Sequence, residues 1–461
     1  MYRLRLLGFN CKITFDTRQL PAPPLFLGCF LMSRKMNFLS LTLLVLATLF
    51  FGSPYSSGTD PQSLGDIDTG DTAWMIVASA FVLLMTPGLA FFYGGMVNKK
   101  NVISTMLQSF VALGVISVLW VFVGFSLCFG ESVGGIIGHP GTYFAFNGVG
   151  LSPNSDFAGT IPFLLFALFQ LKFAVITPAL ITGSFAGRIR FRSYILFMVF
   201  FSLVIYPPLA HMTWHPDGLL RNWGVLDFAG GTVVHMSAGM AALAGALFLG
   251  KREEQNNEPA NIPFVILGTG LLWFGWFGFN AGSAFQANTD AVIAFANTNL
   301  ASATAMITWV FYERFRNRKM SALGACIGAI VGLVAITPAA GFVTMGQSIF
   351  IGFSAALISN WAIQWQRKWS IDDTLDVFPS HGVGGMVGMI MTGLLANEVG
   401  LIHGTTEVFL HHIGALLIVA VFTFFASYGL YALVNQLIPL RVRSDQEQRG
   451  LDHSQHGEKL S

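Results

Sequence analysis

The chain has 461 residues, of which 54% are hydrophobic and 10% charged, and its formal net charge is +2. Soluble domains carry about 25% charged residues, so this composition excludes an ordinary soluble protein and favours one that crosses a membrane repeatedly. The near-neutral charge, without a basic patch interleaved with aromatic residues, gives no indication of nucleic-acid binding. The cysteines are scattered and form no CxxC motif, so neither a metal site nor a disulfide framework is supported.

The first segment with an interpretable pattern is the apolar run 37–51. It follows two basic residues and precedes several small ones, which is typical of a cleaved secretory signal peptide, here over 32–57. Residues 1–31 lie upstream of it and are expected to be an over-extended N-terminus, with Met32 or Met36 as a more natural start. The alternative is a genuine additional N-terminal anchor.

Apolar stretches long enough to cross a hydrocarbon core of about 30 Å follow one another through a membrane domain predicted over 71–439. We therefore predict an all-α polytopic membrane protein with eleven transmembrane helices. The stretches lie at 73–95, 102–130, 160–183, 193–211, 229–250, 262–282, 290–312, 320–337, 343–365, 380–396 and 408–436.

Lysine and arginine gather in alternate loops and in the C-terminal tail, whereas the opposite loops after the signal-like segment hold only Arg221. Because basic loops stay in the cytoplasm, the mature N-terminus is expected outside and the C-terminus inside the cell (inner) membrane. An odd number of crossings arises from two inverted five-helix repeats plus a closing C-terminal helix. The basic loops contain Lys99 and Lys100; Arg188, Arg190 and Arg192; Lys251 and Arg252; Arg314, Arg316, Arg318 and Lys319; and Arg367 and Lys368.

His235 and His381 each lie in an apolar, glycine-rich segment, and each begins the pattern H-x-x-x-G-M. An ionisable group at membrane depth costs about 2.5–3.5 kcal/mol or more, so the two are expected to face one polar site shared by the two repeats. Imidazoles in contact can share one proton while the pair stays neutral. Two alternatives remain open at this point: unrelated histidines bonded to backbone, and a bis-histidine metal or haem site. The latter lacks acidic or thiol ligands close in sequence.

Aromatic residues are the second functional indication. Phe169 and Phe173 are four residues apart, on one face of the third predicted span, and Trp214 is expected in an outer loop. The segment WFGFNAGS adds Phe279 and Ser283. An aromatic face attracts a cation by about 0.5–2 kcal/mol, and a serine hydroxyl can accept a hydrogen bond from an N–H donor. Ordinary packing is the alternative for any single phenylalanine, since the chain has 44.

Two acids open predicted spans. Asp227 begins the fifth span on the outer side, where a carboxylate can cap free N–H groups; the leading interpretation is structural, with a secondary effect of attracting cations. Asp376, five residues before His381, is expected to open the tenth span from the inside in a similar way.

With these residues assembled, the sequence strongly resembles the ammonium transporter family (Amt, methylammonium permease and Rhesus proteins), on the bacterial Amt side. The resemblance runs from Asp71 to about Leu460. Its motifs are DTAWM at 71–75, PGLAFFYGG at 87–95, LDFAGGTVVH at 226–235, GWFGFNAGSA at 275–284, LGACIGAIVGLVAITPAAG at 323–341 and DVFPSHGVGG at 376–385.

The resemblance implies an outer ammonium recruitment site at Trp214, Phe173 and Ser283, with Asp227 nearby and Phe169 as a further candidate. It also implies a gate of Phe173 stacked on Phe279, a twin-histidine pore pair at His235 and His381, no cofactor, and a homotrimer. In the tail, 440–461, it implies an ordered regulatory segment under the pores that a trimeric PII-type signalling protein can bind. The matching tail residues are Gly450, Leu451, Asp452, His456, Gly457 and Glu458. Without the resemblance, this tail is simply polar, and disorder is the alternative.

Two positions depart from the family's pattern: Lys172 lies within the third span, and Gly187 stands where a glutamate is expected. Neither is among the residues assigned to the pore. The favoured function is uptake of ammonium, with ammonia passing the pore; the proton's route stays open. The alternatives are an ammonium sensor and a Rhesus-type neutral-gas channel. No nucleophile–base or metal constellation suggests an enzyme.

Overall fold

A computed structural model describes residues 67–255 and 258–460. The predicted N-terminal segments, 1–31 and 32–57, lie outside these residues. Helices make up nearly all of the regular structure that is described. The exception is a short antiparallel hairpin between α4 and α5, in which β1 (Ser132–Val133) pairs with β2 (Ile137–Gly138).

The first half of the described chain runs from the capped start of α2 to α9. Asp68 caps α2 by accepting a hydrogen bond from the N–H of Asp71. The elements are α2 (Thr69–Met96), η2 (Lys99–Asn101), α3 (Val102–Leu119), η3 (Trp120–Gly124), α4 (Phe125–Phe129), η4 (Phe144–Phe146), α5 (Phe163–Ile181), η5 (Thr182–Phe185), α6 (Phe191–Val204), α7 (Tyr206–Trp214), α8 (Leu219–Asn222), η6 (Gly231–Met236) and α9 (Ser237–Leu249).

The second half has helices whose starts carry side-chain caps, at Asn261, Asn288, Ser321 and Thr344. Such caps satisfy N–H groups that a helix start leaves open. The elements are α10 (Ile262–Ala281), η7 (Gly282–Ala284), α11 (Thr289–Phe315), α12 (Ala322–Ile336), α13 (Met345–Lys368), η8 (Phe378–Val383), α14 (Gly384–Leu395), η9 (Leu401–His403), α15 (Thr406–Leu437), α16 (Ser444–Arg449) and η10 (Asp452–His456).

Each predicted span coincides with one helix or with a series of short helices, so the multi-pass helical membrane fold is confirmed. Within the described residues, nine helical segments are long and apolar enough to cross a membrane. The other two predicted spans correspond to α12, which has 15 residues, and to η8 followed by α14. The count of eleven therefore stays a prediction.

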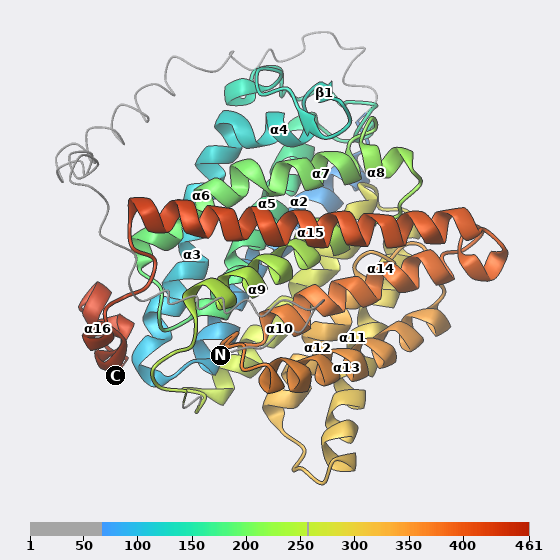
Figure 1. The fold of residues 1–461 in the computed structure, drawn as a ribbon. Coiled ribbons are helices and arrows are strands. Elements are labelled where there is room, and N and C mark those ends of the chain that lie inside the picture. Colours follow the sequence, from blue (N-terminus) through green and yellow to red (C-terminus); the bar gives the residue numbers. More distant parts are fainter. Residues whose placement is uncertain (1–66, 256–257, 461) are drawn as a thin grey trace, which may run out of the picture. The chain divides into compact units, whose positions relative to one another are not determined.

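Close packing of helices depends on glycine at the points where they cross. Figure 1 shows α15 running alongside α9, and the Tyr431 hydroxyl of α15 donates to the carbonyl oxygen of Ala241 in α9 (3.2 Å). At this crossing a Cβ on Gly245 would lie 2.7 Å from that hydroxyl oxygen. Small residues let helix backbones approach in this way where lipid gives no hydrophobic drive for association.

Candidate functional site

The structure brings the two predicted histidines together. The Nδ1 atoms of His235 and His381 lie 3.3 Å apart, and their rings are 5.4 Å apart with an interplanar angle of 27°. Both side chains are buried. One Nδ1 can donate and the other accept, because neutral imidazole carries one N–H and one bare nitrogen. A neutral pair is therefore consistent with this burial.

Both histidines lie in π-helical turns, His235 in η6 and His381 in η8. The glycine four residues after each histidine packs against the segment that carries the other one. A Cβ on Gly239 would overlap the backbone nitrogen of Gly382, and a Cβ on Gly385 would lie 3.0 Å from the carbonyl oxygen of Gly231. The repeated H-x-x-x-G pattern thus marks a crossing of two backbones.

Asp227 caps the start of η6 by accepting several hydrogen bonds. Its carboxylate receives the N–H groups of Gly230 (2.8 Å), Gly231 (2.7 Å) and Thr232 (2.7 Å), and the Thr232 hydroxyl as well. The indole N–H of Trp214 donates to the Asp227 carbonyl oxygen (3.2 Å). These contacts satisfy the open N–H groups of a helix start and hold Trp214 beside the histidine-bearing segment.

The counterpart of Asp227 at η8 is Asp373, so the interpretation of Asp376 is wrong. The Asp373 carboxylate accepts the N–H of Phe378 (2.7 Å), whereas the Asp376 carboxylate lies 3.8 Å from Arg367. Sequence reasoning missed Asp373 although a signal was present. It precedes His381 by the same spacing that separates Asp227 from His235.

Asp373 also makes stability depend on pH, because burial raises the pKa of its carboxyl from 3.8 to about 6. The folded state then binds more protons than the unfolded state between these values. The contribution to stability is present below about pH 4 and is lost as pH rises through 6. Over this window the wild type is expected to lose on the order of 2–3 kcal/mol of unfolding free energy relative to Asp373→Asn. Its unfolding temperature in detergent should therefore fall relative to that of the variant as pH rises. Parallel curves of unfolding temperature against pH for the two proteins would contradict the prediction.

Aromatic rings form a column that leads to the histidines. The ring centroids of Phe173 and Phe279 are 4.2 Å apart, Trp214 lies edge-on to Phe173 at 5.8 Å, and Phe279 lies 5.9 Å from His235. Phe169 contacts Phe173 at 5.0 Å from the side. The predicted recruitment and gate residues thus adjoin one another.

Trp214 differs in position from the expectation, whereas Ser283 does not contradict it. Trp214 is the last residue of α7 rather than part of a loop, because its helix continues from Tyr206. The Ser283 hydroxyl donates to the Phe279 carbonyl oxygen at 2.9 Å, which leaves its lone pairs able to accept a further hydrogen bond.

Two small cavities adjoin the histidine pair. One, of about 10 Å³, is bounded by Phe279, Leu180, Trp276 and both histidines. A second, also of about 10 Å³, is bounded by His381, Ser380, Tyr93 and several aliphatic side chains. Each has room for about one water-sized molecule. His381 borders both, and both linings are largely apolar.

Trp276 is a site residue that sequence reasoning missed. Its ring stacks on His235 with centroids 5.2 Å apart and an angle of 21°, and its indole N–H donates to the Thr337 hydroxyl (2.9 Å). The Nε2 atom of His235 has no hydrogen-bond partner among the described residues, and His235 is one of the residues that line the first cavity. The available signal was the position of Trp276 one helical turn before Phe279, within the motif at 275–284.

The tail lies against the start of α3. The Asp452 carboxylate accepts the N–H groups of Ser104 (2.7 Å) and Ile103 (3.1 Å), and the Leu451 N–H donates to the Asn101 side chain (2.8 Å). These N–H groups belong to a helix start, where partners within the helix are lacking. Asp452 therefore caps a helix that begins about 350 residues earlier in the chain.

The other matched tail residues shape this segment. Gly450 and Gly457 have φ values of 90° and 72°, in the left-handed region that favours glycine. The N–H of Glu458 closes the preceding turn on the Asp452 carbonyl oxygen, and His456 Nε2 lies 3.3 Å from the Ser104 hydroxyl. The tail residues thus pack against the start of α3, and the regulatory role of the tail stays a prediction.

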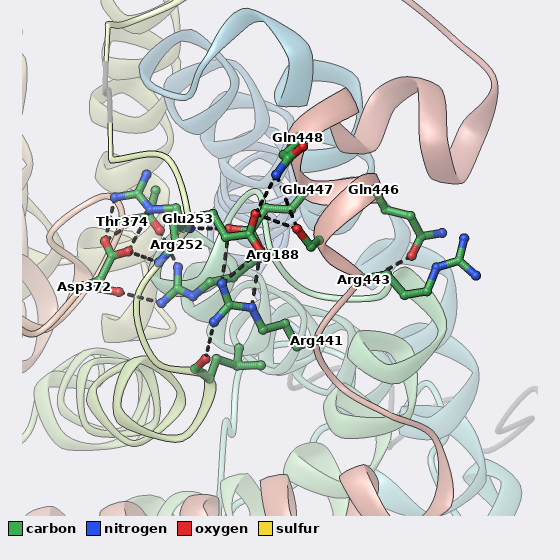
Figure 2. Close-up of polar contacts among 12 residues, drawn as sticks. Arg188, Arg252, Glu253, Asp372, Thr374, Arg441, Arg443, Gln446, Glu447 and Gln448 are labelled. Carbon is green, nitrogen blue, oxygen red and sulfur yellow. Dashed lines mark hydrogen bonds and ion pairs between the residues drawn. The ribbon is translucent and has the colours of Figure 1, made fainter. Parts of the chain in front are cut away.

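Figure 2 shows the polar network that joins the tail to two loops of the membrane domain. Arg441 pairs with Glu447 (3.0 Å), which also accepts the N–H of Glu253 (2.8 Å). The neighbouring Arg252 pairs with Asp372 (2.6 Å). A continuous chain of contacts thus runs from the tail to the loop that precedes η8.

The two departures from the family's pattern have different surroundings. Gly187 has a φ of 83°, and a Cβ there would lie 2.9 Å from the side-chain nitrogen of Asn101, so the local backbone favours glycine. Its neighbour Arg188 is fully buried, donates to the Thr374 hydroxyl (2.8 Å), and has a pKa that burial lowers to about 10. Lys172 is partly buried and has no ion pair within the described residues.

Comparison with known proteins gives consistent matches over nearly the whole described chain. The model of the Ammonium Transporter Family matches residues 73–460. An ammonium transporter from Aquifex aeolicus (strain VF5) is 42% identical over 434 residues, covering 92% of this chain and 99% of that protein. One from Bacillus subtilis (strain 168) is 44% identical over 402 residues, with coverage of 85% and 98%. The crystal structure of Saccharomyces cerevisiae Mep2 matches with a TM-score of 0.77 at 33% identity, covering 83% of this chain and 89% of that one.

Proposed function

The chain belongs to the Ammonium Transporter Family, and on that premise we propose that it takes up ammonium across the cell membrane. Ammonium is captured at the outer aromatic site formed by Trp214, Phe173 and Ser283. It loses its proton near the gate, and ammonia then passes the histidine pair. The observation that carries this proposal is the contact between His235 and His381, with two small, mostly apolar cavities beside it.

The energetics of an ion in such a passage favour deprotonation. Moving an ammonium-sized ion into a low-dielectric medium has an idealised Born cost of about 20 kcal/mol. Cavities of about 10 Å³ have no room for a hydration shell. Ammonia is neutral and carries N–H donors and one lone pair. The unpartnered Nε2 of His235 can exchange a hydrogen bond with it when it occupies the first cavity. Potassium ions can neither donate a hydrogen bond nor lose a proton, so this path excludes them.

The proposed topology is eleven crossings in two inverted five-helix repeats plus the closing helix α15. Two features support it. Each histidine follows a capping aspartate, Asp227 or Asp373, by the same spacing, and each is followed by a glycine at the crossing of the two segments. In this topology the mature N-terminus is outside the cell and the tail is cytoplasmic.

The proposed domain organisation follows the sequence. Residues 71–439 form the membrane domain, after a signal peptide at 32–57 and an over-extended segment at 1–31. Residues 440–461 form a cytoplasmic regulatory tail, and a PII-type protein would bind beneath the pores of a homotrimer. The ordered contacts between the tail and the loop before η8 support a regulatory role.

The test is the current that an ammonium pulse evokes from purified protein in liposomes on a solid-supported membrane. In His235→Ala and His381→Ala we expect a loss of about tenfold or more, equal to at least ~1.4 kcal/mol in the barrier, or a loss of selectivity against potassium. The matched control is His453→Ala, which removes an exposed tail histidine. A pH-reporting dye inside the liposomes records ammonia entry that carries no charge.

The outcomes separate the candidate functions. A saturating ammonium current that potassium does not evoke, and that the control retains, supports transport with net charge through the histidine pair. Dye signal without current indicates a neutral ammonia channel. If well-folded protein gives neither signal, the transport proposal is overturned and a sensor is favoured. One structural relative is named as a sensor Amt protein, and it matches with a TM-score of 0.78 at 29% identity.

A further inference from the structure

The end of α7 presents the main-chain carbonyl group of Trp214 to the segment that follows. A helix leaves its last carbonyl oxygens without partners inside the helix, and basic side chains bond them favourably. Here the Arg221 guanidinium donates to the Trp214 carbonyl oxygen through Nη1, at 2.7 Å. In Figure 1, α8, which carries Arg221, lies beside the end of α7. The tryptophan of the candidate site is therefore held by its backbone as well as by its ring.

The turn between α7 and α8 is tight, which folds α8 back on the helix before it. A Cβ on Gly218 would overlap the carbonyl oxygen of His211, so only glycine fits at this position. The N–H of Leu219 donates to the carbonyl oxygen of Gly135 (2.8 Å), which ties α8 to the turn of the β1–β2 hairpin. The backbone that carries Arg221 is thus fixed by contacts in which its own side chain takes no part.

The ring of Trp214 is fixed separately, against the start of η6. Its indole N–H donates to the Asp227 carbonyl oxygen (3.2 Å), and a Cβ on Gly230 would lie 3.2 Å from the ring atom Cζ2. The ring meets that of Phe173 edge-on at 5.8 Å. A cation is attracted when it lies over the face of an aromatic ring, so a tilt of this ring changes the attraction. The backbone bond to Arg221 and the ring bond to Asp227 together determine where the face points.

The charge of Arg221 taken alone is unfavourable for capture of a cation. Arg221 is exposed, and it is the only lysine or arginine in the loops predicted to lie outside after the signal-like segment. It forms no ion pair within the described part of the chain, so it repels a cation that approaches Trp214. Salt weakens this repulsion, because the Debye length is about 8 Å at physiological ionic strength. The hydrogen bond acts on Trp214 directly, and its effect is therefore expected to outweigh that of the charge.

We propose that Arg221 is a positioning residue for ammonium capture, because its bond to the Trp214 carbonyl oxygen aims the indole face at the captured ion. The inference rests on the proposed function, in which Trp214, Phe173 and Ser283 form the outer site. Arg221 itself does not touch the ion. Loss of its side chain leaves the passage beyond the gate as it was. The ammonium concentration needed for half-maximal transport should therefore rise, while the maximal rate stays nearly the same.

The test is the ammonium-evoked current from protein in liposomes, measured over a range of ammonium concentrations. R221M keeps the aliphatic stem and removes the hydrogen-bond donors. We expect its half-maximal concentration to rise about threefold to tenfold, with a maximal current within about twofold of the wild-type value. R221K keeps a charged donor and should restore most of the wild-type affinity.

N222D is the matched control for charge. Asn222 is exposed and follows Arg221 in α8, and the substitution lowers the local charge by one, as R221M does, without removing the bond to Trp214. If Arg221 acted through its charge, both variants would capture ammonium more tightly, and most of all at low salt. Because we expect it to act by position, only R221M should capture ammonium more weakly. The ratio of its half-maximal concentration to that of wild type should then be the same at low and high salt.

Three results would overturn the proposal. One is a half-maximal concentration in R221M equal to or below that of wild type. Another is a fall in maximal current at an unchanged half-maximal concentration, which marks general damage to the fold. Capture is also measured without transport, as the rise in unfolding temperature that ammonium chloride gives over sodium chloride. An equal rise in wild type and R221M is the third. A rise in wild type that R221M loses supports the proposal even if neither carries current, so its failure is distinguishable from failure of the proposed function.

Discussion

Replacing Asp227 with alanine is expected to destabilise the protein more than any other single substitution at the candidate site. The change removes the acceptor for the N–H groups of Gly230, Gly231 and Thr232 and leaves them buried without partners. A buried unsatisfied group costs about 1–3 kcal/mol, so three approach the whole stability of a typical domain, about 5–15 kcal/mol. We expect a large drop in unfolding temperature and in the yield of monodisperse protein in detergent.

Two comparison variants test whether loss of the capping contacts causes the destabilisation of Asp227→Ala. Asp290→Ala removes an exposed carboxylate in the first turn of α11, where Asn288 is the cap, and should behave as wild type. Asp227→Asn keeps one acceptor oxygen and should fall between wild type and alanine. Should Asp227→Ala unfold at the wild-type temperature, the capping contacts would contribute little, and the role of this residue would have to be sought in cation attraction.

The second large effect is expected at Gly239. An alanine there would place its Cβ against the backbone nitrogen and Cα of Gly382, next to His381. Backbone atoms cannot move aside as a flexible side chain can, so the two segments must separate, at a cost of about 1–3 kcal/mol or more. The separation lengthens the 3.3 Å contact between the histidines. We therefore expect ammonium transport to fall about tenfold or more even in protein that still folds.

The measurement is the ammonium-evoked current of Gly239→Ala at equal protein density, with its unfolding temperature recorded alongside. Gly270→Ala is the matched control, because this glycine is also helical and a Cβ there would meet nothing within 4 Å. A wild-type current in Gly239→Ala would show that the histidine contact tolerates displacement. It would also show that transport does not depend on the glycines at the crossing.

Sequence predicts the helices of this fold well because a membrane span needs length and apolarity, and both are properties of the chain itself. α11 and α15 lie within a few residues of their predicted ranges. The π-helical turns η6 and η8 could not be predicted in this way. A widened turn depends on what packs against it, and the apolar composition is the same with or without it.

The candidate site was predictable where a residue is chemically unusual for its surroundings. Histidines at membrane depth are unusual in this way, so the sequence alone predicts the pair. Asp373 was not predictable in this way, since three acids lie close together at 372–376 and only the fold decides which one faces the start of η8. The sequence does not single out Trp276, because a tryptophan among apolar residues is ordinarily a packing residue. Only the structure shows that its ring stacks on His235.

The contact between Asp452 and the start of α3 has a consequence for biosynthesis. A ribosome makes the chain from its N-terminus, so α3 enters the membrane long before its capping carboxylate has been synthesised. Until the last residues emerge, the N–H groups of Ile103 and Ser104 have only water as a partner. Completion of the chain therefore caps α3, and a product that stops short of Asp452 lacks this cap.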